Sequence, residues 1–590
     1  MDPREQYRLR LDDRSRAAAA LELRHIRIGN ARLAIVVAGL GLAWMVFSLR
    51  ALPAAVLAAP VAAFGVAAAV HAQVIRRWEF AKRAVSYYQK ALARLRSEWA
   101  GTGEPGEDFR DTNHPYCEDL DLFGKGSLFE LLSIARTRSG EQTLAAWLLR
   151  AAPIDTVRQR QHAVEELRSR LDLREDLAVL GEDIRIGVHP NELIRWAEAP
   201  PRLPYSRLWQ PAAALSSLML VSSVVWASTG SASLFLVALA AVAAFGWRLR
   251  SRVLRVVGEA DYAVHDLDLL SQVLERLSRE TFSTPLLCGL RDQINLPASA
   301  RIRRLDRIVE WLDSRDNVVL RILGPPLLYA THLSFAVERW RHVNGRFVRQ
   351  WLEAVGQIEA LSSLAGYAFE HPADPFPELL HEGPWFEAAS LAHPLLDPAR
   401  AVGNDVRINA LEPLLIVSGS NMSGKSTLLR TVGVNTVLAL AGAPVRASKL
   451  RLTPLAVGAT IRVNDSLSAG ESRFYAEVKR LGRVVEMTRT GGPVLFLLDE
   501  LLNGTNSHDR HIGAEAVVRE LVASGAIGLI TTHDLSLVSI AEQARGRNVH
   551  FQDHLEQGKM TFDYRIQAGV VTKSNALELM RMVGLKVDGL

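Results

Sequence analysis

Long runs of uncharged, apolar residues interrupt an otherwise mixed sequence at four places. Each run has about 16 to 22 residues, near the length that a helix needs to cross the hydrocarbon core of a bilayer. The runs are Leu33–Leu49, Ala51–Ala72, Pro211–Ala227 and Ala232–Trp247. Very short polar links, Arg50 and Ser228–Ser231, join the runs in pairs. The pattern predicts two transmembrane helical hairpins, at residues 33–75 and 209–247, and buried helices of a soluble protein are the alternative.

Basic residues flank both hairpins, and the short links carry almost no charge. The flanking residues are Arg24, Arg27, Arg32, Arg76, Arg77, Lys82, Arg83, Arg202, Arg207, Arg248, Arg250, Arg252 and Arg255. Because positively charged loops stay in the cytoplasm, we expect both hairpins to enter and leave the bilayer from that side. Residues 1–32 then form a basic cytoplasmic N-terminus, without the small-residue cleavage site of a signal peptide. The predicted localisation is the cytoplasmic membrane, with a multi-pass topology.

Helical periodicity dominates the segments that follow each hairpin. It is clearest in Tyr87–Trp99, Leu267–Arg279, Ala300–Trp311 and Leu328–Leu361. These segments predict an all-α region in two parts, residues 76–208 and 248–390. His332, Trp340 and His342 lie on these helices, and we interpret them as packing residues.

Composition changes this picture little. The chain has 590 residues, enough for three or four domains, and a net charge of +5. Much of the arginine lies beside the apolar runs, where topology and anionic lipid account for it, so the charge does not by itself indicate nucleic-acid binding. Cys117 and Cys288 are far apart and lack C-x-x-C spacing, which favours a reducing compartment and no cysteine metal site.

A glycine-rich segment matches the phosphate-loop pattern G-x-x-x-x-G-K-[ST] at every fixed position. Its residues are Gly419, Ser420, Asn421, Met422, Ser423, Gly424, Lys425, Ser426 and Thr427. An apolar strand, Leu414–Val417, enters the loop, and a helix leaves it at Leu428. Backbone amides and the helix N-terminus would hold the phosphates of ATP, Lys425 would reach the β and γ phosphates, and Ser426 would bind Mg²⁺.

A second apolar strand, Val494–Leu498, ends in two carboxylates. Parallel strands present their C-terminal ends to the active site, so Asp499 is expected to hold the Mg²⁺ shell and Glu500 to activate the attacking water. A third strand ends at Thr531-Thr532-His533. We expect His533 to contact the γ-phosphate, making Lys425, Glu500 and His533 the catalytic residues.

The order of these motifs resembles that of ABC-type ATPases: phosphate loop, signature, acidic strand, Asp-containing loop and switch histidine. The signature is Ser468-Ala469-Gly470-Glu471-Ser472. In that class two domains face each other head to tail, which implies a homodimer in which Gly470 and Ser472 of one subunit complete the nucleotide site of the other.

Only about fifty residues separate the phosphate loop from the signature, and this compact form resembles the MutS mismatch-repair family. The matching segments are Gly419–Thr427, Asp465–Phe474 with Glu477, Leu498–Glu500 with Gly504-Thr505, Thr532-His533, His393-Pro394 and Asn404-Asp405. A weaker likeness extends this resemblance to the start of the helical core. It lies in Asp121–Gly124, Ser127–Leu132, Arg136–Gly140 and Leu144–Leu149. The implied fold is an α/β ABC-type P-loop ATPase domain at residues 391–590, an all-α MutS-like core and lever region, and the two transmembrane hairpins.

Three positions depart from the family pattern. Arg473 stands where the family's signature has threonine, and Leu502-Asn503-Gly504-Thr505 stands where the family has its G-R-G-T loop. Ala401 stands where the family has the aromatic residue that stacks on adenine. The second hairpin also occupies the interval in which MutS relatives carry a DNA-embracing clamp, and no mismatch-reading domain is visible before the core. The resemblance still implies mismatch repair and DNA binding, with DNA and a protein of unknown identity as partners. The alternatives are an ABC-type transport or transmission ATPase and a nucleotide-gated membrane scaffold without a DNA role.

Overall fold

The computed structural model describes residues 2–187, 189–295, 298–313, 318–420, 422–462, 473–489, 491–502, 507–556 and 559–571. It divides the chain into two compact units. The first contains Met1–Glu104 together with Leu171–Val179, and the second contains Pro105–Arg170 together with Leu180–Leu590. The N-terminal apolar pair thus belongs to a different unit from the second pair and the phosphate loop.

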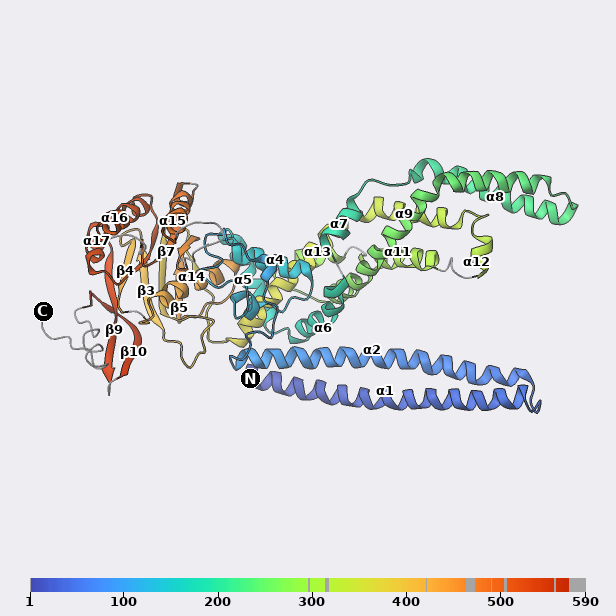
Figure 1. The fold of residues 1–590 in the computed structure, drawn as a ribbon, viewed down its shortest axis with the longest axis horizontal. Coiled ribbons are helices and arrows are strands. Elements are labelled where there is room, and N and C mark those ends of the chain that lie inside the picture. Colours follow the sequence, from blue (N-terminus) through green and yellow to red (C-terminus); the bar gives the residue numbers. More distant parts are fainter. Residues whose placement is uncertain are drawn as a thin grey trace. The chain divides into compact units, whose positions relative to one another are not determined.

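A long helical hairpin forms most of the first unit. Its helices, α1 (Pro3–Phe47) and α2 (Ala58–Leu95), lie side by side and are joined through the short 3-10 helix η1 (Ala54–Leu57) (Figure 1). Asp2 accepts a hydrogen bond from the Arg4 amide and so caps α1, as an N-cap carboxylate commonly does. No proline or glycine pair breaks α1 near residue 32, so the basic N-terminus and the first apolar run form one continuous helix.

A polar cluster joins the open end of this hairpin to the start of α6 (Leu171–Gly187). The buried Tyr7 and Tyr88 rings lie 5.8 Å apart between centroids. The Tyr88 hydroxyl donates to Glu175 Oε2 at 2.6 Å, and Arg14 Nε donates to Glu175 Oε1 at 2.6 Å. These charge-assisted bonds satisfy a carboxylate that would otherwise be costly to bury.

Four helices in the described part of the chain are long and apolar enough to cross a membrane, judged by length and composition alone. They are α1, α2 with its preceding turn, α8 (Tyr205–Thr229) and α9 (Ser233–Ser278). The greater part of each predicted apolar run lies within these elements, although α1 ends two residues before the first run does and the second run begins three residues before η1. Helices α2 and α9 continue far beyond their apolar runs, to Leu95 and Ser278, so the hairpins and the predicted helical region share the same helices.

Helix α13 (Tyr329–Glu370) is the axis of the helical part of the second unit. It packs against α4, α5, α7, α9 and α11, and its Trp351 is fully buried. The helices of this part are η2 (Glu107–Phe109), α3 (Leu128–Leu132), α4 (Arg138–Leu149), α5 (Ile154–Arg168), α7 (Pro190–Glu198), α10 (Pro285–Asn295), α11 (Ala298–Asp313) and α12 (Val318–Leu323). The periodic segments at 267–279, 300–311 and 328–361 are helical, as expected, in α9, α11 and α13.

A buried carboxylate joins α13 to the N-terminus of α4. Glu359 accepts hydrogen bonds from the amides of Arg136 and Thr137 at 3.3 and 3.2 Å and from the Thr137 hydroxyl. The Thr137 hydroxyl in turn caps α4 by accepting from the Gly140 amide at 3.0 Å. Burial raises the pKa of Glu359 to about 7, although these donors favour the ionised form. The contact sets the position of α4 on α13.

The C-terminal part is an α/β domain built on a six-stranded sheet with the order β10-β9-β4-β8-β7-β6. The strands are β4 (Leu414–Ser418), β6 (Ala456–Thr460), β7 (Val494–Asp499), β8 (Ile527–Thr532), β9 (Arg547–Glu556) and β10 (Lys559–Ala568). All neighbours are parallel except β9 and β10. A smaller sheet, in the order β1-β5-β2-β3, contains β1 (Glu378–Leu379), β2 (Trp385–Leu391), β3 (Asn404–Asn409) and β5 (Lys449–Leu452).

Helices cover both faces of the six-stranded sheet, and residues alternate along β7 accordingly. Phe496 and Leu498 belong to a core with α15 (Arg473–Arg489) and α16 (Ser507–Ala523). Leu497 points to the other face, toward Gly433 of α14 (Lys425–Ala441). A short 3-10 turn, η4 (Leu535–Val538), and α17 (Ser539–Gln543) follow β8. Because both faces are covered, the strands are continuous apolar runs, which explains their clear sequence signal.

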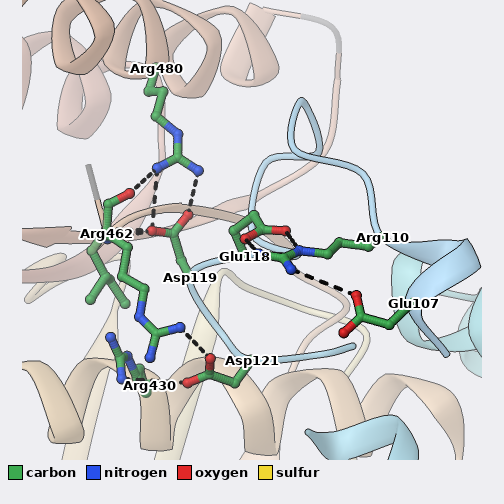
Figure 2. A network of polar contacts seen from close by, with 9 residues as sticks. Glu107, Arg110, Glu118, Asp119, Asp121, Arg430, Arg462 and Arg480 are labelled. Carbon is green, nitrogen blue, oxygen red and sulfur yellow. Dashed lines mark hydrogen bonds and ion pairs between the residues drawn. The ribbon is translucent and has the colours of Figure 1, made fainter. Parts of the chain in front are cut away.

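Charged side chains connect the segment before α3 to the α/β domain (Figure 2). The centre of this network is Asp119, which is fully buried. Asp119 accepts from the amides of Ile461 and Arg462 at 2.8 and 2.7 Å and from Arg480 Nη2 at 2.8 Å. Nearby, Asp121 pairs with Arg462 and with Arg430 of α14. One loop therefore binds the end of β6 and the helices α14 and α15.

We expect Asp119→Asn to destabilise the α/β domain by about 3 kcal/mol, because the change leaves Arg480 partly buried without its counter-charge. The asparagine oxygen can still accept from the two amides, so the substitution isolates the ion pair. Thermal unfolding of the full chain followed by fluorescence should show a lower midpoint. Hydrogen exchange of peptides from α15 should be faster than in the wild type.

Glu118→Gln is the matched control for this substitution. Glu118 is on the same loop and pairs with Arg110 at 2.5 Å, but the Arg110 side chain is 48% exposed. Exposed pairs contribute about 0.2–1 kcal/mol, so this variant should unfold close to the wild type. Equal effects of the two substitutions would show that Asp119 is no more important than a surface pair.

Candidate nucleotide site

The phosphate loop is formed by the end of β4, residues 419–424 and the first turn of α14. Gly419 and Gly424 have φ angles of 149° and 104°. A Cβ atom at Gly419 would lie 2.9 Å from Ser423 Oγ, and one at Gly424 would lie 3.2 Å from the Tyr564 ring. Both positions therefore need glycine, for backbone conformation and for space. The free amides at the start of α14 face the loop, as in anion-binding helix N-termini.

Lys425 lies inside this loop and is 5% exposed. Its ammonium donates to the carbonyls of Gly419 and Ser420 at 2.7 and 2.9 Å. Burial lowers the pKa of Lys425, and the negative charges of Glu500 and Asp499 partly oppose that effect. The hydroxyls of Ser420 and Ser423 are buried and make no hydrogen bond with a described atom. A buried cation and two buried hydroxyls without partners fit a site that receives an anion.

The two carboxylates at the end of β7 have different environments. Asp499 Oδ1 accepts a hydrogen bond from the Thr531 hydroxyl of the neighbouring strand β8. Glu500 follows it with a φ of 47°, a strained conformation for a residue other than glycine. The Glu500 amide donates to the Thr531 carbonyl at 3.2 Å and to its hydroxyl at 3.1 Å. This turn directs the Glu500 side chain away from the strand and toward the loop.

His533 lies beside the second carboxylate. Its Nδ1 atom is 3.3 Å from Glu500 Oε1, and its side chain is 45% exposed. The structure thus brings together Asp499, Glu500 and His533 at the ends of adjacent strands. It places the first two within electrostatic range of Lys425.

A cavity of about 700 Å³ opens beside the loop and extends away from it. Among the site residues predicted from sequence, those that line this cavity are Ser420, Met422, Gly424, Lys425, Ser426, Thr427 and Glu500. The cavity is also lined by residues to which the sequence had given no role in the site: Leu391, Leu396, Arg400, Val402, Phe551 and Tyr564. His393 and Asn404, noted only as part of a family-like segment, also line it. Burial lowers the pKa of His393 to about 4, so this ring is neutral near pH 7.

Tyr564 enters the cavity through an irregularity in β10. The register of β9 and β10 shifts between Phe562 and Ile566, and Tyr564 has a φ of 56°. Asn404 holds this bulge, because its amide donates to the Tyr564 carbonyl at 2.9 Å and its oxygen accepts from the Ile566 amide at 2.8 Å. Bulges commonly re-aim a side chain beside a functional site. No local sequence signal marks this one, since it depends on pairing with β9.

Three predicted site residues lie outside the described residues: Asn421, Gly470 and Ser472. The described chain stops at Arg462 and resumes at Arg473 on either side of the signature. Both flanks are bound to Asp119, through the Arg462 amide and through Arg480 of α15. The expected position of the signature opposite a second copy stays a prediction.

Comparison with known proteins agrees with this arrangement. Residues 415–588 match the family model of MutS domain V. The DNA mismatch repair protein MutS of Natronomonas pharaonis is 28% identical over 243 residues, which are 40% of this chain and 28% of that protein. Endonuclease MutS2 of Thermomicrobium roseum is 32% identical over 206 residues, 33% of this chain and 25% of that protein.

A third relative, the DNA mismatch repair protein MutS 2 of Halobacterium salinarum, is 31% identical over 238 residues, 39% of this chain and 27% of that protein. The chain therefore spans only about a quarter of the length of these curated relatives. The likeness and the strand, loop and helix arrangement agree on the same C-terminal region. The chain is a MutS-related protein, and the likeness includes a match of residues 415–588 to MutS domain V.

Proposed function

We propose that this chain is an ABC-type ATPase of the MutS branch, which binds ATP with Mg²⁺ and hydrolyses it. The observation that carries the proposal is the cavity lined by the buried cation Lys425, the unpartnered Ser420 hydroxyl and Glu500. On binding, the phosphates replace the loop carbonyls as partners of Lys425. The residues that would hold Mg²⁺ are Ser426 and Asp499, and the ion would neutralise charge on the phosphates.

Glu500 is the general base of this proposal. Its strained backbone and its contact with His533 hold the carboxylate toward the loop. A carboxylate in this place can accept a proton from the attacking water, and His533 can contact the γ-phosphate once it is bound. Lys425 keeps the negative charge of the phosphates compensated throughout.

The aromatic lining of the cavity suits the base of the nucleotide. Ala401 cannot stack on adenine, but Tyr564 and Phe551 line the same cavity from β10 and β9. Aromatic rings supply a flat apolar surface for stacking. We propose that Tyr564 supplies the aromatic contact that Ala401 lacks.

Two copies of the chain form the complete catalytic unit in this proposal. The support is the order of the motifs, which in ABC-type ATPases places the signature of one subunit against the nucleotide of the other. Gly470 and Ser472 would then act in trans, while Lys425, Asp499, Glu500 and His533 act in cis. An isolated protomer would bind ATP and turn it over poorly.

The membrane part of the proposal rests on exposed apolar surface. Between none and 17% of each apolar window in the four long helices is buried inside the protein. Leu40 of α1, Val61 of α2 and Val224 of α8 are 66%, 72% and 68% exposed. Water is a poor solvent for so large an apolar surface, whereas lipid chains are a good one. We therefore propose that both hairpins insert into the cytoplasmic membrane, with the ATPase in the cytoplasm.

DNA is the proposed partner, in a DNA-repair context, and the support is the relationship to mismatch-repair proteins. In this proposal any DNA affinity comes from arginines on the helices of the core and is mainly electrostatic. The resemblance to MutS implies a DNA-embracing clamp in the interval that here contains the second hairpin, α8 and α9. This observation favours a second candidate, a nucleotide-gated membrane scaffold or transmission ATPase with no DNA role. The absence of charged residues from Pro211–Ala227 argues against a transport pore.

We expect Glu500→Gln to lower ATP turnover at least about a hundredfold, the usual contribution of a general base. Binding of ATP should persist, because the loop and the Mg²⁺ ligands are unchanged. Light scattering after size exclusion should show an ATP-dependent dimer that does not dissociate. Glu486→Gln on the exposed side of α15 is the control. A turnover in Glu500→Gln equal to that of the wild type would rule out the base assignment.

Membrane insertion is tested by extraction with alkaline carbonate, which should leave the full chain in the membrane pellet. Protease added to the periplasmic side should not cleave the α/β domain. The double change Val221→Arg and Val224→Arg should reduce insertion, since each arginine at a helix centre costs about 2.5–3.5 kcal/mol. Recovery of the wild type in the soluble fraction would mean that these helices have another apolar partner.

Competition between matched and single-mismatch duplexes at a fixed salt concentration tests the DNA role. We expect binding that falls steeply with salt, with a preference for the mismatch below tenfold, which corresponds to about 1.4 kcal/mol. A larger preference would indicate that the chain reads mispairs directly. No binding at low salt would favour the scaffold function.

A further inference from the structure

A second large cavity, of about 830 Å³, lies at the base of the second hairpin. It is formed by the first turns of α8 together with α11 and α13. Aromatic side chains (Tyr205, Trp209, Phe335 and Trp340) and three arginines (Arg301, Arg304 and Arg339) line it, with Ser206, Ile308, His332, Ala336, Val343 and Asn344. No acidic residue is present in this lining as far as the chain is described. The cavity is thus both apolar and positively charged.

The three arginines have no carboxylate partner among the described residues. Arg304 and Arg339 are exposed and form no ion pair there, in contrast to Arg303 on the same helix, which pairs with Glu275 at 3.0 Å. Arg301 lies over the Phe347 ring at 4.9 Å, and its Nη1 atom is buried without a hydrogen-bond partner. Trp340 fixes this turn of α11, because its Nε1 donates to the Arg301 carbonyl at 2.7 Å. Three uncompensated guanidinium groups around one cavity favour an anionic ligand.

The cavity lies where α8 changes from polar to apolar. Trp209 is 51% exposed and precedes the start of the apolar run at Pro211 by two residues, a rise of about 3 Å. Ser216, about 8 Å into the run, donates to the Leu327 carbonyl at 2.9 Å. The neighbouring α12 exposes Ile322 and Leu323 by 68% and 55%. With the hairpin inserted as proposed above, the cavity opens at the level of the lipid headgroups, where tryptophan and tyrosine are enriched.

We propose that this cavity binds the phosphodiester headgroup of an anionic phospholipid from the cytoplasmic leaflet. The arginines contact the phosphate, and the exposed apolar residues of α8 and α12 lie along the acyl chains. Basic pockets on the cytoplasmic side of membrane helices bind the phosphate-containing headgroups of anionic lipids. His332 and Trp340, interpreted from sequence as packing residues, line the site. His332 also contacts Ser216 of the hairpin, with 2.9 Å between Nε2 and Oγ.

A lipid fits these observations better than a nucleic acid does. The walls of the cavity are largely aromatic and aliphatic, and one of the lining residues, Trp209 of α8, lies two residues before the apolar run and is 51% exposed. A DNA backbone would need an extended basic surface without exposed leucine and isoleucine beside it. The volume is in the range of sites that enclose a small ligand, and a phospholipid headgroup is of that size.

Native mass spectrometry of the full chain in detergent, titrated with phosphatidylglycerol or phosphatidylcholine, tests the proposal. The wild type should retain one tightly bound phosphatidylglycerol in preference to phosphatidylcholine. The double change Arg304→Gln and Arg339→Gln should weaken phosphatidylglycerol binding about twenty-five-fold, a factor of about five for each arginine. The double change Arg303→Gln and Arg307→Gln on α11 removes the same charge outside the cavity and should change the affinity less than twofold.

Competitors identify the source of the phosphate. Neither glycerol 3-phosphate nor a short DNA duplex should displace the lipid at concentrations equal to it, because they lack acyl chains. Displacement by glycerol 3-phosphate would assign the cavity to a soluble phosphate ester, and displacement by the duplex would assign it to nucleic acid. Equal weakening in both double variants would overturn the proposed site.

This inference rests on the proposed insertion of the second hairpin into the membrane. Carbonate extraction distinguishes a failure of the lipid site from a failure of membrane insertion. A wild type that resists extraction but shows no lipid preference contradicts the lipid site alone. A wild type that is extracted contradicts the membrane proposal itself. ATP binding by each variant reports that the α/β domain is folded.

Discussion

The buried carboxylate of Asp119 connects the two parts of the second unit. It comes from the loop before α3, and it accepts hydrogen bonds from the end of β6 and from α15. An unpaired charge in such a place would cost several kcal/mol, so the loop, β6 and α15 are constrained to move together or to break the pair. The signature lies in the chain between Arg462 and Arg480. Any movement of the signature on nucleotide binding therefore acts on the Asp119 loop.

From this loop the contacts continue into the helical core. The loop leads to α3 and α4, and Glu359 of α13 binds the N-terminus of α4. Helix α13 also contributes Arg339 and Trp340 to the cavity at the base of the hairpin. The described part of the second unit thus contains a continuous series of packed elements from the nucleotide site to the second hairpin. These contacts define which ion pairs a coupling experiment should break.

Much of this site could be predicted from sequence because its residues are local to strand ends. Asp499 and Glu500 lie at the end of an apolar strand, and Lys425 follows another after the six-residue glycine-rich loop, so periodicity and motif place them without knowledge of the fold. Tyr564 and Phe551 could not be found in this way, because they reach the cavity through the pairing of β9 with β10, more than a hundred residues from the loop. Asp119 was missed for a similar reason, since its burial results from contacts with residues some 340 positions later in the chain. Periodicity indicated the long helices, but it could not show that α1 and α9 continue unbroken past their apolar runs.

The length of α1 has a geometric consequence of its own. A straight helix rises about 1.5 Å per residue, so the 23 residues between Arg10 and Leu33 span about 35 Å. With the first hairpin inserted in the membrane as proposed, α1 and α2 extend over this distance from the lipid surface to the tyrosine and arginine cluster around Glu175, which includes Arg10. On that proposal, a protein that recognises the cluster must itself extend about this far from the bilayer, so the length of α1 restricts which membrane neighbours can touch it.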